Sequence, residues 1–335
     1  MTHMGSIEYR FINLLGQEKA KRLLREAVAQ RKMSHAYLFR GPDGVGKNRA
    51  ALTFASYINC QSPHGDDGCG SCASCKKYLS GNHPDLIIVQ PDGAAIKIGQ
   101  IRELKKQLVF PPLEAKYRVV ILEDVHTMKR EAANSLLKTL EEPAEQNLLI
   151  LTADQAGDIL PTILSRCQAV PFMPLAYEHL ASIIREENEL DEATAQTLAA
   201  VSEGSLGRAQ LLLKDNLLAF RRHIIEQVLG VQHGQSGSVE TVFRLAEKIG
   251  EQKENTYELL TLLRLWLRAL IILKAGEPES SLVNQDLLSL LPAAGKRWDM
   301  DQLYGRLRLL DRAEKELQQN CTRSLVFEIL FFQLL

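Results

Sequence analysis

The chain has 335 residues, which is long enough for two or three domains of ordinary size. Hydrophobic residues make up 45% and charged residues 24% of the sequence, as in globular proteins. The formal net charge of −1 excludes binding to nucleic acid through an overall positive field. Any DNA contact must come from local basic pairs, of which the sequence offers Lys76–Lys77, Lys105–Lys106 and Arg221–Arg222. Such pairs are more often solvated faces of helices.

Neither end of the chain predicts a membrane association. The first residues are polar and lack the apolar core of a signal peptide. The apolar stretch Ser324–Leu335 is shorter than the roughly 20 residues that a membrane span needs, and Glu328 and Gln333 interrupt it. We therefore expect a cytoplasmic protein in which this stretch is a buried helix or a contact between subunits.

The first half of the sequence alternates between short apolar runs and helical patterns. Strands are expected over Ala36–Phe39, Asp85–Val89, Arg118–Leu122 and Asn147–Thr152. Helices are expected over Gln17–Arg31, from the glycine-rich segment after the first strand through Tyr57, and over Ile98–Val109 and Ala132–Glu142. Buried strands alternating with helices predict a parallel sheet of the α/β class.

From Leu175 onward the sequence predicts helices only. Short helices are expected over Tyr177–Leu190, Glu192–Ser202 and Leu206–Lys214, and longer ones follow. A loop with glycine and serine, Gly230–Ser238, interrupts this helical half.

The segment after the first strand resembles a phosphate-binding loop, Gly-x4-Gly-Lys-[Ser/Thr], except at its last position. Gly41, Gly44 and Gly46 allow backbone N–H groups to turn toward phosphate oxygens, and Lys47 neutralises the outer phosphates. Asn48 stands where a hydroxyl normally holds magnesium, and its amide is a poorer ligand for that ion. The pattern predicts that ATP or ADP can bind, with an impaired magnesium site.

An acidic pair, Glu123–Asp124, ends the strand Arg118–Leu122, where such a site needs carboxylates for the metal and the attacking water. The usual order is Asp then Glu, so each carboxylate is displaced by one carbon. Misplacement by about 1 Å can cost roughly 10²-fold in rate. Together with Asn48, this order predicts binding with weak or absent hydrolysis rather than an active ATPase.

Four cysteines crowd into one short segment, with two residues between the last three: Cys60, Cys69, Cys72 and Cys75. In a cytosolic protein such a cluster favours metal over disulfides. Four thiolates would complete a tetrahedral zinc site with no open position, so the predicted zinc is structural. Two alternatives are a reduced, metal-free loop and a site in which His64 replaces one cysteine.

Two strings resemble those of bacterial DNA polymerase III clamp-loader subunits, which are AAA+ proteins. They are Ala-Asn-Ser-Leu-Leu-Lys-Thr-Leu-Glu-Glu-Pro over Ala133–Pro143 and Leu-Pro-Thr-Ile-Leu-Ser-Arg-Cys-Gln over Leu160–Gln168. Gly16–Gln17, His35–Phe39 and the cysteine spacing match this family as well.

The resemblance implies three domains. These are an AAA+ α/β domain over 1–172 with an inserted zinc module at 60–75, a helical lid over 173–212 and a helical collar over 213–335. The border near 212 rests on the resemblance, because the loop at 230–238 is an equally visible break. In the collar, the final helix would bind other subunits with a face made of Val326, Ile329, Leu330 and Leu334.

The family has two branches that differ in the phosphate site. Tau/gamma subunits resemble working ATPases, whereas delta prime has a degenerate site and acts as a stator in the ring of subunits. Asn48 and the order Glu123–Asp124 favour delta prime. The resemblance then implies a component of the DNA polymerase III holoenzyme, in a hetero-pentamer with tau/gamma and delta subunits that loads the sliding clamp onto primed DNA.

The resemblance also implies roles for single residues. Arg166, in the string Ser-Arg-Cys, would be an arginine finger that reaches a nucleotide held by a neighbouring subunit. Thr152 stands at the first sensor position, although a buried threonine satisfied by the backbone explains it equally. Arg208 lies near the second sensor position, one residue later than in the active branch. Cys167 is interpreted as a packed small residue rather than a nucleophile.

Two other functions stay open at this stage. The first is an active motor subunit of the tau/gamma type. The second is a P-loop kinase in which Asp124 activates an acceptor, although the helical half and the string Ser-Arg-Cys have no evident role in a kinase.

Overall fold

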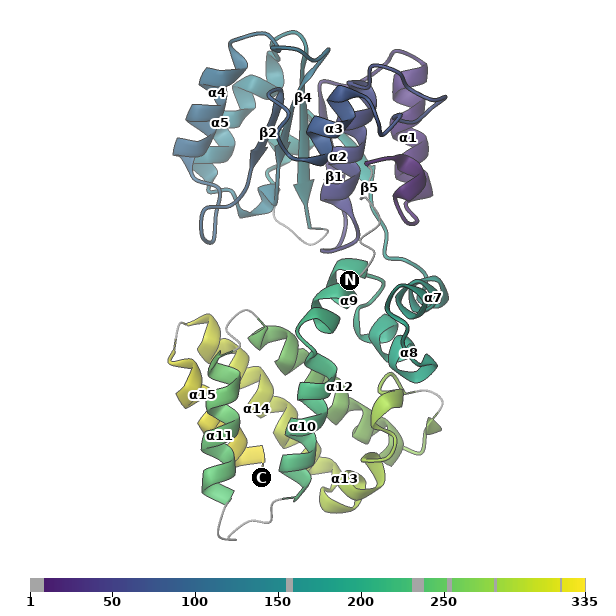
Figure 1. Ribbon diagram of the computed structural model, residues 1–335. Coiled ribbons are helices and arrows are strands. Elements are labelled where there is room, and N and C mark those ends of the chain that lie inside the picture. Colours follow the sequence, from purple (N-terminus) through teal and green to yellow (C-terminus); the bar gives the residue numbers. More distant parts are fainter. Residues whose placement is uncertain are drawn as a thin grey trace. The chain divides into compact units, whose positions relative to one another are not determined.

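The structure is a computed structural model that describes residues 9–154, 159–230, 238–251, 255–279, 282–319 and 321–334. The chain forms two compact units (Figure 1). The first comprises the residues up to Leu175 together with Ser205–Gly207, and the second comprises Ala176–Gly204 and the chain from Arg208 onward.

The first unit is built on a parallel sheet. Within the described residues its strands lie in the order β2-β3-β4-β1-β5. They are β1 (Ala36–Arg40), β2 (Leu86–Val89), β3 (Arg118–Leu122), β4 (Asn147–Ala153) and β5 (Gln168–Pro171). The four predicted strands are confirmed. The edge strand β5 was not predicted, because Gln168 and Ala169 are exposed and the segment carries no apolar run.

Helices cover both faces of this sheet. They are α1 (Glu18–Ala29), α2 (Lys47–Ile58), α3 (Ala73–Leu79), α4 (Ile98–Leu108), α5 (Arg130–Glu141) and α6 (Pro161–Leu164), with the 3-10 helices η1 (Phe11–Asn13) and η2 (Val125–Thr127). Figure 1 shows α1, α2 and α3 on one side and α4 and α5 on the other. Side chains alternate along each strand, so Phe39 and Ile121 join one core, and Leu38 and Leu122 join the other.

The second unit is helical throughout its described residues. It contains α7 (Tyr177–Asn188), α8 (Glu192–Val201), the larger part of α9 (Leu206–Lys214), α10 (Leu217–Gly230), α11 (Ser238–Glu251), α12 (Thr256–Lys274), η4 (Gln285–Leu287), α13 (Leu291–Arg297), α14 (Met300–Gln318) and α15 (Arg323–Leu334). The predicted class, a parallel α/β part followed by an all-helical part, is confirmed. The border near 212 stays a prediction, and residues 231–237 of the expected loop lie outside the described residues.

A single apolar core holds the helices from α10 to α15 together, and Trp266 and Trp298 meet in it edge to face at 5.5 Å between ring centroids. None of the described helices is both long and apolar enough to cross a membrane.

The structure corrects two expectations about this unit. Val326, Leu330 and Leu334 of α15 are buried in their own core and cannot serve a second chain, whereas Ile329 is 37% exposed. When a helix is apolar on nearly all sides, its sequence does not indicate which face points inward. Arg221 is fully buried and bound to Asn284 and Asp286, so it belongs neither to the solvated helix face expected for its pair nor to a DNA contact.

A buried ion pair braces the segment between α4 and β3. Asp85 is fully buried, and its carboxylate accepts N–H bonds from Leu113, Glu114 and Ala115 at 2.7, 2.9 and 2.9 Å. Arg118 lies 3.5 Å from Asp85 and donates to the backbone carbonyls of Gln107, Phe110 and Pro111. Hydrogen bonds from these two side chains to backbone groups, rather than those of a helix or strand, therefore order this segment.

We expect Asp85→Asn to lower the free energy of unfolding by about 2–3 kcal/mol, because an amide cannot accept all these bonds or balance Arg118. Urea denaturation measures this. The control is Asp92→Asn, in an exposed pair with Lys97, which should cost less than about 1 kcal/mol. Equal effects of the two variants on the free energy of unfolding would contradict a stabilising role for the Asp85–Arg118 pair.

Because the pKa of Asp85 is shifted, the stability that this ion pair contributes depends on pH. Burial would raise that pKa, but the three N–H donors and Arg118 outweigh burial and hold it below its ordinary value. The stabilisation is therefore complete above the unfolded-state pKa of about 3.9, and it is lost as the pH falls through the folded-state pKa.

Candidate nucleotide and metal sites

The residues of the predicted phosphate site meet at one edge of the sheet. The glycine loop follows β1, Glu123–Asp124 follow β3, and Thr152 lies near the end of β4. Because β3, β4 and β1 are adjacent and parallel, their carboxyl ends lie at the same edge. The fold therefore brings together residues that lie more than a hundred positions apart in the sequence.

The loop has the conformation that its glycines permit. Gly46 has φ = 97°, a left-handed value that favours glycine. A Cβ atom at Gly41 would lie 2.3 Å from the backbone oxygen of Phe172, so only glycine fits there. The carbonyl of Gly44 accepts an N–H bond of 2.9 Å from Gly207, at the start of α9.

Lys47 begins α2 and folds back onto the loop. Its Nζ donates to the carbonyl oxygens of Gly41 and Pro42, both at 2.8 Å, and the residue is only 4% exposed. Three N–H donors on one ammonium group suit phosphate oxygens equally well. The residues present thus fit a nucleotide, provided that Lys47 exchanges these carbonyls for phosphate.

Asn48 and Glu123 contact each other. The side-chain amide of Asn48 lies beside the Glu123 carboxylate, which accepts a bond of 3.1 Å from Gln90 Nε2. Burial raises the pKa of Glu123, and these two amides oppose the rise. The Asn48 Oδ1 atom is buried without a hydrogen-bond partner among the described residues. The carboxylate on the metal side therefore lies beside two amides.

Asp124 and Thr152 are joined through the backbone. The N–H of Asp124 donates to the hydroxyl oxygen of Thr152 at 3.1 Å, and Thr152 is fully buried. Burial, followed by repulsion from Asp43, raises the pKa of Asp124, while His126 and Lys47 lower it. A carboxylate with a raised pKa is a stronger proton acceptor than an ordinary one. The sensor role of Thr152 stays a prediction.

Arg208 belongs to the helical unit. Its Nε and Nη2 atoms lie 2.9 Å from the Glu258 carboxylate, and its Nη1 atom is 4.0 Å from Glu203. Its role as a second sensor stays a prediction.

Two glutamines at this edge were not predicted as site residues. Gln17 donates to the carbonyls of Val45 and Met173 at 3.2 and 2.7 Å and accepts from Met173 N–H at 3.0 Å. It therefore ties the phosphate loop to the chain after β5. Gln90 directly follows β2, and this position at the carboxyl end of a strand was the signal that could have identified it.

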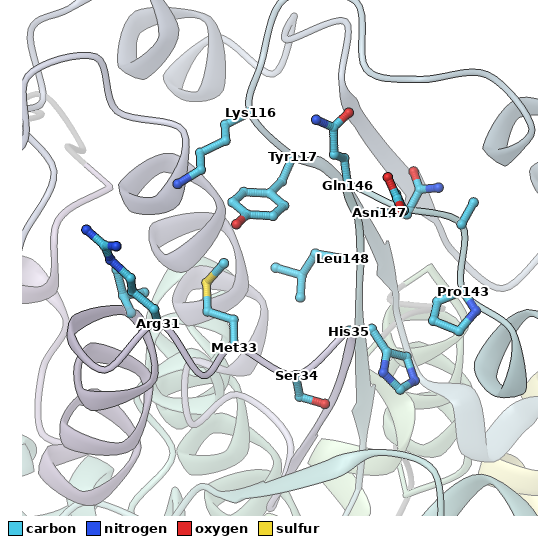
Figure 2. A pocket seen from close by; sticks show the side chains of 13 residues that line it. Arg31, Met33, Ser34, His35, Lys116, Tyr117, Pro143, Gln146, Asn147 and Leu148 are labelled. Carbon is cyan, nitrogen blue, oxygen red and sulfur yellow. The ribbon is translucent and has the colours of Figure 1, made fainter.

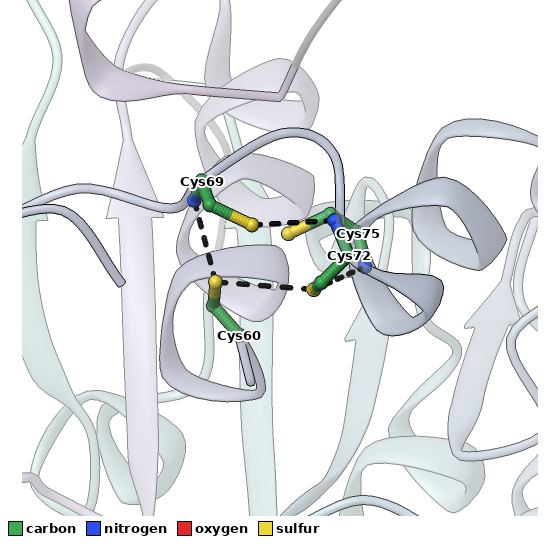
Figure 3. Close-up of side chains that lie close together, drawn as sticks. All are labelled: Cys60, Cys69, Cys72 and Cys75. Atoms are coloured by element: carbon green, nitrogen blue, oxygen red, sulfur yellow. Dashed lines mark hydrogen bonds between the residues drawn. The ribbon is translucent and has the colours of Figure 1, made fainter. Parts of the chain in front are cut away.

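The four clustered cysteines converge on one point (Figure 3). Their sulfur atoms all lie within 4.8 Å of one another, and Cys60 Sγ is 4.0 Å from Cys72 Sγ. A tetrahedral ion with metal–sulfur bonds of about 2.3 Å needs sulfur atoms roughly 3.8 Å apart. Backbone N–H groups of Cys69, Cys72 and Cys75 point at sulfur atoms of the cluster at 3.3, 3.3 and 3.4 Å. The distances between the four sulfur atoms are compatible with one bound metal ion.

The surroundings of the thiols differ. Burial raises the pKa of Cys75 to about 12. At Cys69 burial acts in the same direction, but N–H donors outweigh it and lower the pKa to about 6. A bound dication would favour the thiolate form at all four positions. Burial also raises the pKa of Cys167 to about 12, which agrees with a packed thiol.

The cysteine segment is fastened to the rest of the unit at two points. The Asp67 carboxylate accepts N–H bonds from Phe11 and Ile12, at 2.9 and 3.1 Å. On the other side, the fully buried Tyr78 of α3 accepts a bond of 2.7 Å from Asn59. The segment therefore orders residues on either side of α2.

Arg166 follows α6 and is one third exposed. Its guanidinium lies 2.5 Å from Glu141, at the last residue of α5, and also contacts the carbonyl of Thr162 and the hydroxyl of Ser165. The structure thus places the side chain at the surface, held by its own unit.

A pocket of about 530 Å³ opens at the amino ends of β1, β3 and β4 (Figure 2). Arg31, Met33, Lys116, Tyr117 and Leu148 are among the side chains that line it. This is the edge of the sheet opposite the phosphate loop, so the pocket does not belong to the predicted site.

Comparisons with known proteins agree with these features. The family model described as DNA polymerase III, delta subunit, matches residues 16–176. The DNA polymerase III subunit delta′ of Bacillus subtilis is 32% identical over 94% of this chain and 94% of its own length. The delta′ subunit of Pseudomonas aeruginosa is 36% identical over 58% of this chain and 60% of its own.

Two further likenesses are partial or weak. The tau subunit of Bacillus subtilis is 34% identical over 65% of this chain but only 39% of its own length. A solved gamma subunit-related protein from Thermotoga maritima covers 94% of this chain and 97% of its own at 18% identity, with a TM-score of 0.41, which is too low to support an argument. The family is decided by the Bacillus subtilis delta′ match, which spans nearly all of both proteins. The chain belongs to the delta′ subunit family of DNA polymerase III.

Proposed function

We propose that this protein is the stator of a clamp loader, acting in the cytoplasm without membrane contact. It would assemble with tau/gamma and delta subunits into a hetero-pentamer and support ATP-driven loading of the sliding clamp onto primed DNA. The observation that carries the stator role is Asn48 at the position of the hydroxyl magnesium ligand, inside an otherwise preserved phosphate loop. A subunit of this kind holds its shape while its neighbours hydrolyse ATP.

The phosphate loop would bind ATP or ADP and hydrolyse ATP slowly. Lys47 and the loop N–H groups supply the binding. Magnesium would be held poorly, because Asn48 replaces the hydroxyl ligand and Glu123 already accepts a bond from Gln90. Thr152 and Arg208 would serve as sensors of the nucleotide.

The chain would divide into an AAA+ domain over 1–172, a lid over 173–212 and a collar over 213–335. Arg166 would act as an arginine finger in the nucleotide site of a neighbouring subunit. Zinc at Cys60, Cys69, Cys72 and Cys75 would be structural, since four thiolates leave no open position for catalysis.

A second candidate is an active motor of the tau/gamma type, which the 34% identity to Bacillus subtilis tau favours. Membership of the delta′ family removes the reason to consider a kinase.

Turnover of ATP by the purified chain separates the two candidates. We expect a rate at least about 100-fold below that of a tau subunit assayed in parallel, since a misplacement of about 1 Å already costs that much. Binding of labelled ATP should persist and should be lost in Lys47→Ala. Omitting the chain from a reconstituted loader should abolish clamp loading. Turnover equal to that of tau would favour the motor, and loading without the chain would end the proposal.

A further inference from the structure

The guanidinium of Arg166 is ordered before any neighbour is present. Nη2 donates to Glu141 Oε1 at 2.5 Å, and Nη1 donates to Thr162 O at 2.9 Å and Ser165 Oγ at 3.1 Å. Among the described residues Nε has no hydrogen-bond partner. The Nε–H group and one hydrogen of Nη2 therefore remain available for a phosphate.

Glu141 is the only charged group among these acceptors, and its position in the helix needs an explanation. It is the last residue of α5, where the negative end of the helix dipole disfavours a carboxylate. The adjacent Glu142 is also exposed, yet within the described residues it makes no ion pair. Glu141 and Glu142 have the same side chain, and they differ in that only Glu141 contacts Arg166.

An exposed arginine side chain samples many rotamers, and fixing them during catalysis slows the reaction. A guanidinium that is already held loses less freedom when it enters a phosphate site. Glu141 acts on a residue rather than on the nucleotide, so it is a positioning residue.

We propose that Glu141 positions Arg166 for insertion into the nucleotide site of a neighbouring subunit. This inference rests on the finger role proposed above for Arg166. The residue would fix the direction of the guanidinium while leaving the Nε–H group and one Nη2 hydrogen for the transferred phosphoryl group.

The test uses the reconstituted loader with clamp and primed DNA. We expect Glu141→Ala to lower the single-turnover rate of ATP hydrolysis at the site that Arg166 serves about fivefold, with the affinity for ATP unchanged, which is the upper range for one exposed ion pair. Glu141→Gln retains an acceptor for Nη2 and should lie between Glu141→Ala and the native chain. Glu142→Ala, the matched control, should leave this single-turnover rate unchanged. Metal content and assembly into the loader should be the same for all variants.

A double variant separates positioning from a general loss of structure. Arg166→Ala combined with Glu141→Ala should be no slower than Arg166→Ala alone, because Glu141 acts only through Arg166. Additive losses, or a Glu141→Ala variant as fast as or faster than the native chain, would overturn the inference. If Arg166→Ala itself has no effect, the proposed finger fails instead.

Discussion

Replacing Arg166 with alanine should slow ATP hydrolysis at the neighbouring site by about 10³-fold or more, with folding intact. A guanidinium supplied in trans offsets charge that develops in phosphoryl transfer and is worth about 10³–10⁵ in rate. The side chain is one third exposed, and its contacts with Glu141, Thr162 and Ser165 lie at the surface. Its removal should therefore leave both cores unchanged.

Rapid-quench hydrolysis of ATP prebound to the reconstituted loader measures this effect. Sites that do not use Arg166 should react at the native rate, and the served site should retain its ATP. Arg166→Lys should recover little, because lysine lacks the planar fork of donors. Arg185→Ala is the control, since Arg185 forms a comparable exposed pair with Glu192. Native single-turnover kinetics in the Arg166→Ala loader would remove the finger role.

Replacing Cys72 with serine should remove the metal and destabilise the α/β unit by about 5 kcal/mol. Structural zinc contributes roughly 10–16 kcal/mol in isolated peptides. We expect less here, because Asp67 and Tyr78 also fasten the segment. For a unit of this size the loss corresponds to a fall in Tm of about 10–20 °C.

Native mass spectrometry of the purified chain should find one zinc ion, and the Cys72→Ser variant should contain none. Thermal unfolding with and without a chelator gives the stability change. Cys321→Ser is the matched control, because Cys321 is an exposed cysteine outside the cluster, and it should retain both metal and Tm. A native chain without stoichiometric metal would leave the reduced, metal-free loop as the correct interpretation.

Features that depend on neighbours along the chain were predictable. The phosphate loop, the reversed acidic pair and the cysteine spacing are each written within a few consecutive residues. The strands β1, β3 and β4 were recognisable because a strand buried on both faces is a continuous apolar run. The edge strand β2 carries such a run too, although Ile88 is 42% exposed. That these segments meet at one edge then follows from parallel pairing.

Features that depend on contacts between distant residues needed the tertiary structure. The sequence predicts that Arg221 is half of a surface pair, and only the fold places Asp286, 65 positions later, against it. Glu141 and Glu142 are equivalent in sequence, and only the packing of α5 against α6 decides which one reaches Arg166. Side-chain charge and periodicity specify what a residue is able to bind, whereas the partner that is within reach depends on how the segments pack.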